Sequence, residues 1–361
     1  MAFLELHILQ NVAPANLNRD DTGNPKDAMF GGVRRARISS QALKRAMRLA
    51  LRDALPPGEL STRTKRVSEL VADRLAEHPR TESLVAASRL FEAAGIVVGD
   101  TKKGDAETKY LILLGDDEAD ALAALAREHW DALTAAKPDL GAMRGPARAA
   151  LRSSAVDLAL FGRMVADLPE VGVDGACSVA HAISTHRLAA EFDYFTALDE
   201  LARAEETGAA MIESTGFNSA TFYRYLAIDL GELEQRVGAE RLKTALPAII
   251  RAAVLALPTG KQHAFAAHNP PSFVLAVVRD GAPVSLANAF VAPVRQTEQR
   301  DLVRASVDAL VAYRDSVAAM YGDADVRTTA AVALGEIELG SLEANRVPTL
   351  DALVASVAAA A

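Results

Sequence analysis

The chain contains 361 residues, 50% of them hydrophobic, and carries a formal net charge of −8. This length and composition suffice for two or more folding units with sizeable cores. No uninterrupted apolar segment approaches the ~20 residues that cross a bilayer, and the single cysteine, Cys177, excludes an internal disulfide, so we expect a soluble protein of the reducing cytoplasm.

The first predicted element is a strand. Residues Ala2–Gln10 alternate, with Glu5 and His7 among apolar side chains. They lack the basic start and apolar run of a signal peptide, so we do not interpret them as one.

Basic residues are concentrated in the next segment. Between Arg19 and Arg48 there are eight lysines and arginines against three aspartates, a net charge of +5, which leaves −13 for the rest of the chain. Such segregation focuses positive potential on one surface and indicates a site for a polyanion. A solvated helix face is the alternative.

The end of this segment is predicted to be a helix that Ser39 or Ser40 caps. Its apolar side chains recur at helical steps, at Leu43, Ala46, Met47, Ala50, Leu51 and Ala54. Its polar side chains have the same spacing on the opposite face, at Gln41, Lys44, Arg45, Arg48 and Arg52. Arg34, Arg35 and Arg37 precede the helix. A helix N-terminus flanked by arginines offers N–H groups, a favourable dipole and charge to one anion, as a nucleic-acid backbone requires.

The rest of the chain predicts an α+β body interrupted by a helical module. Ser61 to about Ala166 is rich in alanine and leucine and is predicted to be helical, with an exposed loop at Gly99–Thr108. After Gly175 the predicted strands are Ser178–Ser184, Phe222–Ile228, Phe273–Arg279 and Ala331–Leu339. The predicted helices between and after them are Leu230–Leu257, Glu298–Met320 and Thr349–Ala360.

The sequence does not have the residue spacing of common catalytic motifs. Leu255 stands where a Walker A loop ending at Gly260–Lys261 requires glycine, and the sequence has no G-x-S-x-G elbow. Cys177, His181 and His186 would supply three zinc ligands without a fourth, so we interpret both histidines as hydrogen-bonded structural residues. We therefore expect neither a metal nor a cofactor.

Several segments together resemble one protein family. LNRDDTGNPKDAMFGG (Leu17–Gly32) and VRRARISSQALKRAMR (Val33–Arg48) resemble the amino-terminal signature of CasC, the backbone subunit of the type I-E CRISPR surveillance complex Cascade. Further similar segments follow in the family's order: LALFGRM (Leu158–Met164), DGACSVAHAISTHR (Asp174–Arg187), FDYFTALDEL (Phe192–Leu201), FYRY (Phe222–Tyr225), and more loosely KQHAFAAHNP (Lys261–Pro270) and SLANAF (Ser285–Phe290).

The resemblance implies an α+β fold shaped like a right hand. Its palm would be a modified RNA-recognition-motif, or ferredoxin-like, fold with inserted helical fingers and a β-hairpin thumb. The implied boundaries are 1–57, 181–191 and 225–361 for the palm, 58–180 for the fingers and 192–224 for the thumb. The usual RNP1 pattern of glycine and aromatics is not visible, so we expect thumb aromatics rather than the palm sheet to meet bases.

The resemblance further implies a non-catalytic scaffold that polymerises along a CRISPR guide RNA (crRNA). Combined with the charge pattern, it predicts RNA contacts at Arg19, Lys26, Arg34, Arg35, Ser39, Gln41, Lys44, Arg45, Arg48, Arg163, Met164, Tyr194, Phe195 and Thr196. Without the resemblance, Met164 would be assigned to a helix core. An internal salt bridge is an equally open interpretation of Arg163.

The implied partners are the crRNA guide, the target DNA strand, neighbouring copies of the chain arranged head to tail, and the other Cascade subunits, namely the large, small and crRNA-end-binding ones. Lys102 and Lys103, in the predicted loop, would contact target DNA or a partner subunit.

Two other functions stay open. Asp20, Asp21 and Asp27 could hold a metal ion that cleaves RNA, as the catalytic aspartate of the related type III backbone subunits does. We instead expect Asp20 and Asp21 to position Arg19 and the nearby backbone through hydrogen bonds. A sequence-specific RNA regulator would show strong preference among unrelated RNAs.

Overall fold

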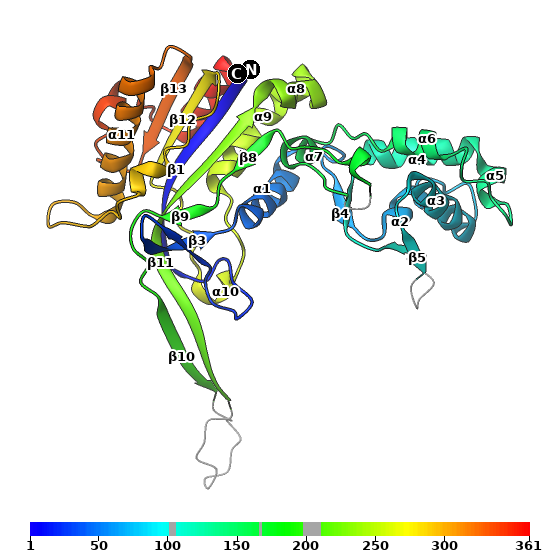
Figure 1. Cartoon of the computed structure of the whole chain (residues 1–361), viewed down its shortest axis with the longest axis horizontal. Coiled ribbons are helices and arrows are strands. Elements are labelled where there is room, and N and C mark those ends of the chain that lie inside the picture. Colours follow the sequence, from blue (N-terminus) through cyan, green and yellow to red (C-terminus); the bar gives the residue numbers. More distant parts are fainter. Residues whose placement is uncertain (101–105, 166–167, 198–210) are drawn as a thin grey trace, which may run out of the picture. The chain divides into compact units, whose positions relative to one another are not determined.

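The structure, a computed structural model of the chain, describes residues 1–100, 106–165, 168–197 and 211–361 (Figure 1). The chain divides into two compact units. Unit 1 comprises residues 1–50, 178–230 and 246–361, and unit 2 comprises residues 51–177 and 231–245. The mixture of helices with a largely antiparallel sheet confirms the predicted α+β class.

A nine-stranded sheet forms the centre of unit 1. Its main path runs β13 (Val326–Ala333), β12 (Phe273–Asp280), β1 (Ala2–Ala15), β11 (Met211–Asp229), β9 (Ala182–Ser184), β3 (Val33–Ile38) and β2 (Asp27–Phe30). The remaining strands, β8 (Cys177–Val179) and β10 (Glu191–Ala197), also pair with β11. Strand β1 is antiparallel to both neighbours, with Leu6 opposite Leu226 and Ala276. The predicted strand at the start of the chain is thus confirmed and lies centrally.

Alternation along β1 gives the sheet two different faces. On one face, Leu9 lies in a core cluster with Leu275 of β12 and Leu310 of α11 (Leu302–Tyr321). Helix α11 covers this face together with the short 3-10 helices η2 (Ala287–Phe290) and η3 (Gly340–Asn345) (Figure 1). Helix α12 (Leu350–Ala360) packs against β12 and β13.

The opposite face carries a buried arginine. Arg224 lies opposite Ile8 in the β1–β11 register and donates hydrogen bonds to the carbonyl oxygens of Ala253 and Val254, at 2.6 and 3.0 Å. These carbonyls belong to the last turn of α9 (Ala239–Leu255), where a helix has no internal donors left, so the guanidinium satisfies them. Burial lowers the pKa of Arg224 to about 10.

Unit 2 is mainly helical and has its own core. Its helices include α2 (Val67–Ala72), α3 (Arg80–Ala94), α4 (Asp116–Glu128), α5 (Trp130–Thr134), α6 (Arg144–Ala150), α7 (Val156–Phe161), the 3-10 helix η1 (Pro169–Val171), most of α8 (Leu230–Val237) and the first part of α9. Two small antiparallel pairs interrupt the predicted helical block, β4 (Thr62–Thr64) with β7 (Ile112–Leu114) and β5 (Val98–Asp100) with β6 (Ala106–Thr108). The predicted loop at Gly99–Thr108 is therefore partly wrong, because both of its ends are strands.

Other predicted boundaries fail for local reasons. The predicted helix Leu230–Leu257 is two helices, because Gly238 between them has a φ of +86° and ends α8. The predicted strand Ser178–Ser184 is divided between β8 and β9, and the one at Ala331–Leu339 begins earlier, at Val326. Helix α11 begins four residues later than predicted because the Asp301 carboxylate caps it. Among the described residues, no helix combines the length and apolar character needed to cross a membrane.

Candidate nucleic-acid interface

A closed loop begins the basic segment of unit 1. The Asp20 carboxylate accepts hydrogen bonds from the Thr22 hydroxyl at 2.8 Å and from the backbone N–H groups of Thr22 and Asn24 at 2.9 and 3.0 Å. These bonds, led by that of the hydroxyl, favour the charged carboxylate and lower the pKa of Asp20. Asp20 therefore fixes the backbone of this loop, which confirms that part of the prediction. Arg19 and Asp21 are both exposed, and the positioning of Arg19 by these aspartates stays a prediction.

A tight hairpin follows this loop. Strands β2 and β3 are joined at Gly31 and Gly32, which both have positive φ values, +59° and +76°, as a two-residue hairpin turn requires. A Cβ on Gly31 would lie 1.7 Å from the Val291 carbonyl oxygen, so only glycine permits this approach. Arg34 on β3 is exposed and forms an ion pair with Asp27 on β2. Asp27 thus already has a basic partner within the hairpin.

Arg35 points the opposite way from Arg34 and is fully buried. Its guanidinium donates hydrogen bonds to five backbone carbonyl oxygens, those of Phe30, Ser184, Thr185, Phe290 and Val291. The prediction that Arg35 contacts RNA is not supported by this position, because every donor group faces the protein interior. The sequence pattern of adjacent arginines could not separate the two, since strand alternation sends one outward and one inward.

Helix α1 (Ser40–Ala54) starts where the sequence predicted. The Ser39 carbonyl oxygen accepts from the N–H groups of Ala42 and Leu43, and the Ser39 N–H donates to the Asn18 side chain at 2.8 Å. The Ser40 N–H donates to His181 Nδ1 at 3.1 Å. His181, which directly precedes β9, thus lies at the N-terminus of α1, where the helix backbone carries partial positive charge.

Two cations, Lys26 and Arg37, lie near this helix start. The Lys26 N–H donates to the Asn18 carbonyl at 2.9 Å, and Arg37 Nε donates to the Asp27 carbonyl at 2.9 Å. Partial burial lowers the pKa of His181, and the positive charges of Arg37 and Lys26 lower it further. Lys26, Arg37 and the α1 N-terminus therefore form one electropositive surface around the neutral His181 ring, and we call these four groups the α1 cationic site. Such a site favours an anion such as phosphate.

The two faces of α1 agree with the predicted phasing. Leu43, Met47 and Leu51 are buried, whereas Gln41 and Arg45 are exposed. Ser39, Lys44 and Arg48 are half-buried, which leaves part of each side chain accessible. The polar stripe extends the α1 cationic site along the helix.

Lys261 approaches from a distant part of the sequence. Its Nζ donates to the Thr215 hydroxyl on β11 at 3.3 Å. The preceding residue, Gly260, packs so closely that a Cβ there would lie 2.3 Å from the Leu17 carbonyl oxygen. A fixed lysine therefore lies beside the start of the basic segment, although charge counting along the sequence did not single it out.

Exposed aromatic residues occupy the hairpin of β10 and β11. Tyr194 pairs with Ser214 and Phe195 with Glu213, and the two aromatic side chains point to opposite faces. Phe192 and Tyr194 are 67% and 64% exposed, and Phe195 is 39% exposed. Phe192 and Tyr194 lie on the same face of β10, so this face of the hairpin exposes two aromatic side chains next to each other. The side chain of Thr196 lies outside the described part of the structure, as do Lys102 and Lys103.

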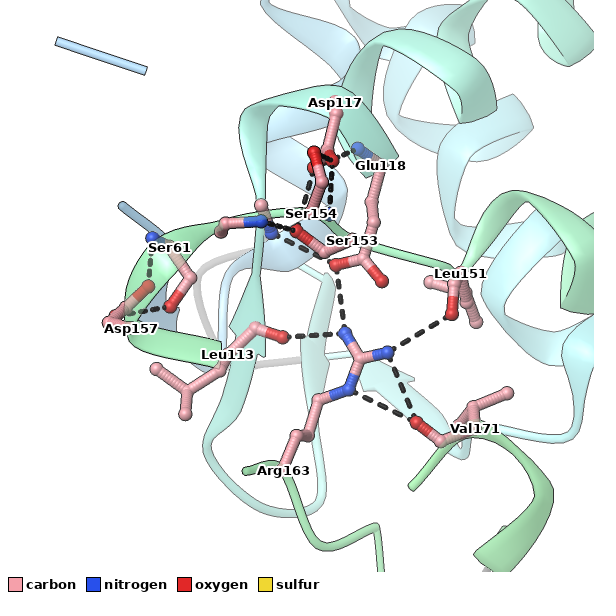
Figure 2. A network of polar contacts seen from close by, with 12 residues as sticks. Ser61, Leu113, Asp117, Glu118, Leu151, Ser153, Ser154, Asp157, Arg163 and Val171 are labelled. Carbon is pink, nitrogen blue, oxygen red and sulfur yellow. Dashed lines mark hydrogen bonds and ion pairs between the residues drawn. The ribbon is translucent and has the colours of Figure 1, made fainter. Parts of the chain in front are cut away.

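In unit 2, the Arg163 guanidinium forms its hydrogen bonds within the protein (Figure 2). Its Nη1 lies 2.8 Å from Glu118 Oε2 and 3.0 Å from the Leu113 carbonyl oxygen, and its other nitrogens donate to the carbonyls of Leu151 and Val171. Both side chains of the ion pair are at most 2% exposed. The structure therefore has the internal salt bridge rather than an RNA-facing Arg163.

Met164, the next residue, is 88% exposed. Helix α7 ends at Phe161, and Gly162, with a φ of +77°, turns the chain into a short antiparallel bridge between Arg163 and Val173. Alternation along this extended segment buries Arg163 and exposes its neighbour. Met164 is not the core helix residue that the sequence alone indicated, and its position leaves the predicted RNA contact possible.

The histidines are hydrogen-bonded structural residues, as predicted. His181 accepts from Ser40, and His186 Nε2 accepts from the Thr221 N–H at 3.1 Å. Within the described ranges, no three His, Cys, Asp or Glu side chains are grouped so that they could hold a metal ion.

The comparison with protein families gives one decisive match. The model of the family described as CT1975-like protein matches residues 4–356. The chain belongs to the CT1975-like family. No curated protein matches its sequence.

Solved structures agree with the family. A chain described as "CRISPR RNA-guided surveillance complex, pre-nicking" is 30% identical, with a TM-score of 0.86 over 99% of both chains. A second, described as "CRISPR RNA-guided surveillance complex", is 26% identical, with a TM-score of 0.77 over 99% of this chain and 100% of that one. These matches confirm the resemblance to a Cascade backbone subunit that the sequence segments indicated.

Three residues of this CT1975-like chain join the interface without having been predicted there. Arg37 was named among the arginines beside the predicted helix N-terminus but not among the predicted RNA contacts. His181 was considered only as a structural residue, and Lys261 only as part of a failed motif and of a segment that resembles the family. For Lys261 and His181, the only available signal was their position in segments that resemble the CasC family.

Proposed function

We propose that this chain is the crRNA-binding backbone subunit of a type I-E Cascade, without catalytic activity of its own. Family membership and the likeness to chains of RNA-guided surveillance complexes support this proposal. The observation that carries it is the convergence of Lys26, Arg37 and His181 at the N-terminus of α1.

The α1 cationic site and the polar stripe of α1 would hold the guide by its phosphates. Arg19, Arg34, Ser39, Gln41, Lys44, Arg45 and Arg48 would extend the contact beyond Lys26. Phosphate contacts fix the register of a strand without reading its sequence, as a guide with variable spacers requires. Base pairing between guide and target DNA would then supply the specificity.

Met164 and the β10–β11 hairpin would shape the bases. An exposed methionine can insert between two bases and unstack them, and Phe195 can hold the displaced base by stacking, with Thr196 beside it, while Tyr194 faces the other side of the hairpin. Bases between such points would remain stacked and available for pairing with target DNA.

In the proposed assembly, residues 1–57, 181–191 and 225–361 form an RNA-recognition-motif-like palm, residues 58–180 the fingers and residues 192–224 the thumb. The mainly helical character of unit 2 and the pairing of β10 with β11 support this division. Copies would stack head to tail in the cytoplasm, a heterologous contact that generates a filament along the guide. The large, small and crRNA-end-binding subunits would complete the complex, and Lys102 and Lys103 would face target DNA or a partner.

The first test compares binding of the full chain to three unrelated RNAs of equal length. A scaffold should bind all three within about threefold, with affinity falling steeply as salt rises. A large preference for one RNA would instead identify a sequence-specific regulator. Placing 2-aminopurine along one RNA adds a test of base displacement, because its fluorescence rises on unstacking. Met164→Ala should remove the increase.

The same RNAs test the nuclease alternative. Asp27 is paired with Arg34 and Asp20 with its own loop, which leaves Asp21 as the more open carboxylate. We expect intact RNA after incubation of the assembled complex with Mg²⁺. Cutting that disappears in Asp21→Ala would establish the nuclease instead.

A further inference from the structure

A cavity of about 310 Å³ lies in unit 1 between α11 and the sheet. Helix α11 packs tightly at its first half, where Val307 and Leu310 are fully buried, but Val317 and Ala318 in its second half are only half-buried. This looser end leaves space above β1, β12 and β13. The lining is largely apolar and includes Leu275, Val277, Val284, Leu286, Tyr313 and Val317.

The His7 ring forms part of the lining and is 2% exposed. Its Nδ1 lies 2.9 Å from the Tyr223 hydroxyl oxygen. The Tyr223 hydroxyl oxygen also accepts a hydrogen bond from the Leu286 N–H at 3.0 Å. Tyr223 therefore occupies Nδ1 of the His7 ring, and Nε2 is the ring nitrogen left for another partner.

Within the described part of the chain, no hydrogen bond of His7 Nε2 is found. Burial, with the nearby charge of Arg279, lowers the pKa of His7 to about 3, so the ring is neutral near pH 7. The edge of the ring turned away from Tyr223 thus offers an uncharged nitrogen that can hydrogen-bond to a ligand. Because His7 lines the cavity, a ligand in the cavity can contact this ring.

The cations that line the cavity already have carboxylate partners. Arg279 Nε donates to Glu5 Oε2 at 2.6 Å, and Arg314 Nη1 donates to Asp315 at 3.2 Å. Since these charges offset one another, the cavity gives no strong preference for an anion. Tyr321, also in the lining, is 76% exposed, so the cavity is open to solvent at this residue.

We propose that this cavity binds an uncharged aromatic molecule with a polar group that hydrogen-bonds to His7 Nε2. The volume lies at the lower end of the ~300–1,000 Å³ typical of ligand sites, which suits one ring or two fused rings. The site uses none of the residues of the α1 cationic site, so it stands independently of the proposed RNA function.

Benzamide, whose amide group can both donate and accept a hydrogen bond, tests the proposal on the full chain. Saturation-transfer NMR should detect its binding, and the His7 side-chain ¹⁵N signals should shift in a histidine-labelled sample. Toluene, which has the ring but no acceptor, should bind at least tenfold more weakly. Ala318→Phe fills the cavity from α11 and should reduce benzamide binding at least fivefold. Ala312→Phe, on an exposed position of the same helix outside the lining, should leave it unchanged.

Absence of benzamide binding to the parent chain would overturn the proposal. So would binding that Ala318→Phe leaves intact, or that Ala312→Phe reduces equally, because the ring would then lie elsewhere. Equal affinities for toluene and benzamide would remove the hydrogen bond to His7 and with it the proposed ligand class.

Discussion

The basic stripe of α1 and the Arg163 network of unit 2 use the same kind of side chain in opposite ways. Arg45 is exposed on a helix whose other face is buried, so its charge is available to a partner. The Arg163 side chain is only 2% exposed and donates its hydrogen bonds to Glu118 and to three backbone carbonyl oxygens. Arg35, within the basic segment, belongs with Arg163 rather than with Arg45. Net charge along a sequence therefore overstates the charge that a surface presents.

The largest expected effect comes from breaking the buried pair. Arg163→Met would leave Glu118 buried without its cation and should lower the free energy of unfolding by about 3–5 kcal/mol. Trp130, the only tryptophan, lies in unit 2, so its fluorescence during urea unfolding reports on this unit specifically.

Two variants control this measurement. Arg163→Met with Glu118→Gln removes the isolated charge but keeps an acceptor for the Gly115 N–H, and should recover at least half of the loss. Arg152→Met, at an exposed arginine, should change stability by less than about 0.5 kcal/mol. An equally small effect of Arg163→Met would show that the network does not hold unit 2 together.

A smaller effect is expected from the buried His7 of unit 1. Its pKa falls from 6.5 to about 3 on folding, so between these values the unfolded chain binds more protons than the folded one. The contribution of His7 to the free energy of unfolding should therefore be fully present above about pH 6.5. It should decline on acidification by about 1 kcal/mol per pH unit. Urea unfolding at pH 4.5 to 7.5 should show a shallower decline in His7→Gln than in the parent. Parallel declines would mean that His7 takes up its proton in the folded state.

The smallest effect is expected at Met164, next to Arg163. Because its side chain is exposed, Met164→Ala should change the free energy of unfolding by less than about 0.5 kcal/mol. A buried methionine would cost about 2–5 kcal/mol, which Trp130 fluorescence would readily detect. A decrease of the free energy of unfolding in that range would show that Met164 is buried in the core.

Periodicity predicted the parts of the fold that depend on local pattern. The α1 stripe, the strand at Ala2–Gln10 and the helix ending at Ala360 follow from the spacing of apolar residues. The β5–β6 pair and the split of Leu230–Leu257 did not follow, because pairing of short strands and the conformation of Gly238 are set by contacts outside the window that a pattern covers.

The candidate site was predicted as a segment rather than as a surface. Charge located residues 19–48, but His181 and Lys261 reach that region only through folding, and no spacing rule joins positions so far apart. Arg35 was assigned to RNA and Arg163 was left open between RNA and an internal ion pair, because a sequence shows a charge but not the buried carbonyl oxygens that accept its hydrogen bonds. The family resemblance supplied the hypothesis for Met164, which composition could not have given.

The salt dependence of RNA binding tests the central claim most directly. Binding of the full chain to one RNA should be measured across salt concentrations for the parent, Lys26→Gln, Lys44→Gln and Lys243→Gln. If Lys26 and Lys44 each hold a phosphate, either substitution should lower the slope of log affinity against log salt by about one. Lys243, an exposed lysine on α9, should leave the slope unchanged. Slopes for Lys26→Gln and Lys44→Gln equal to that of the parent would contradict the assignment of the α1 cationic site and its stripe to RNA.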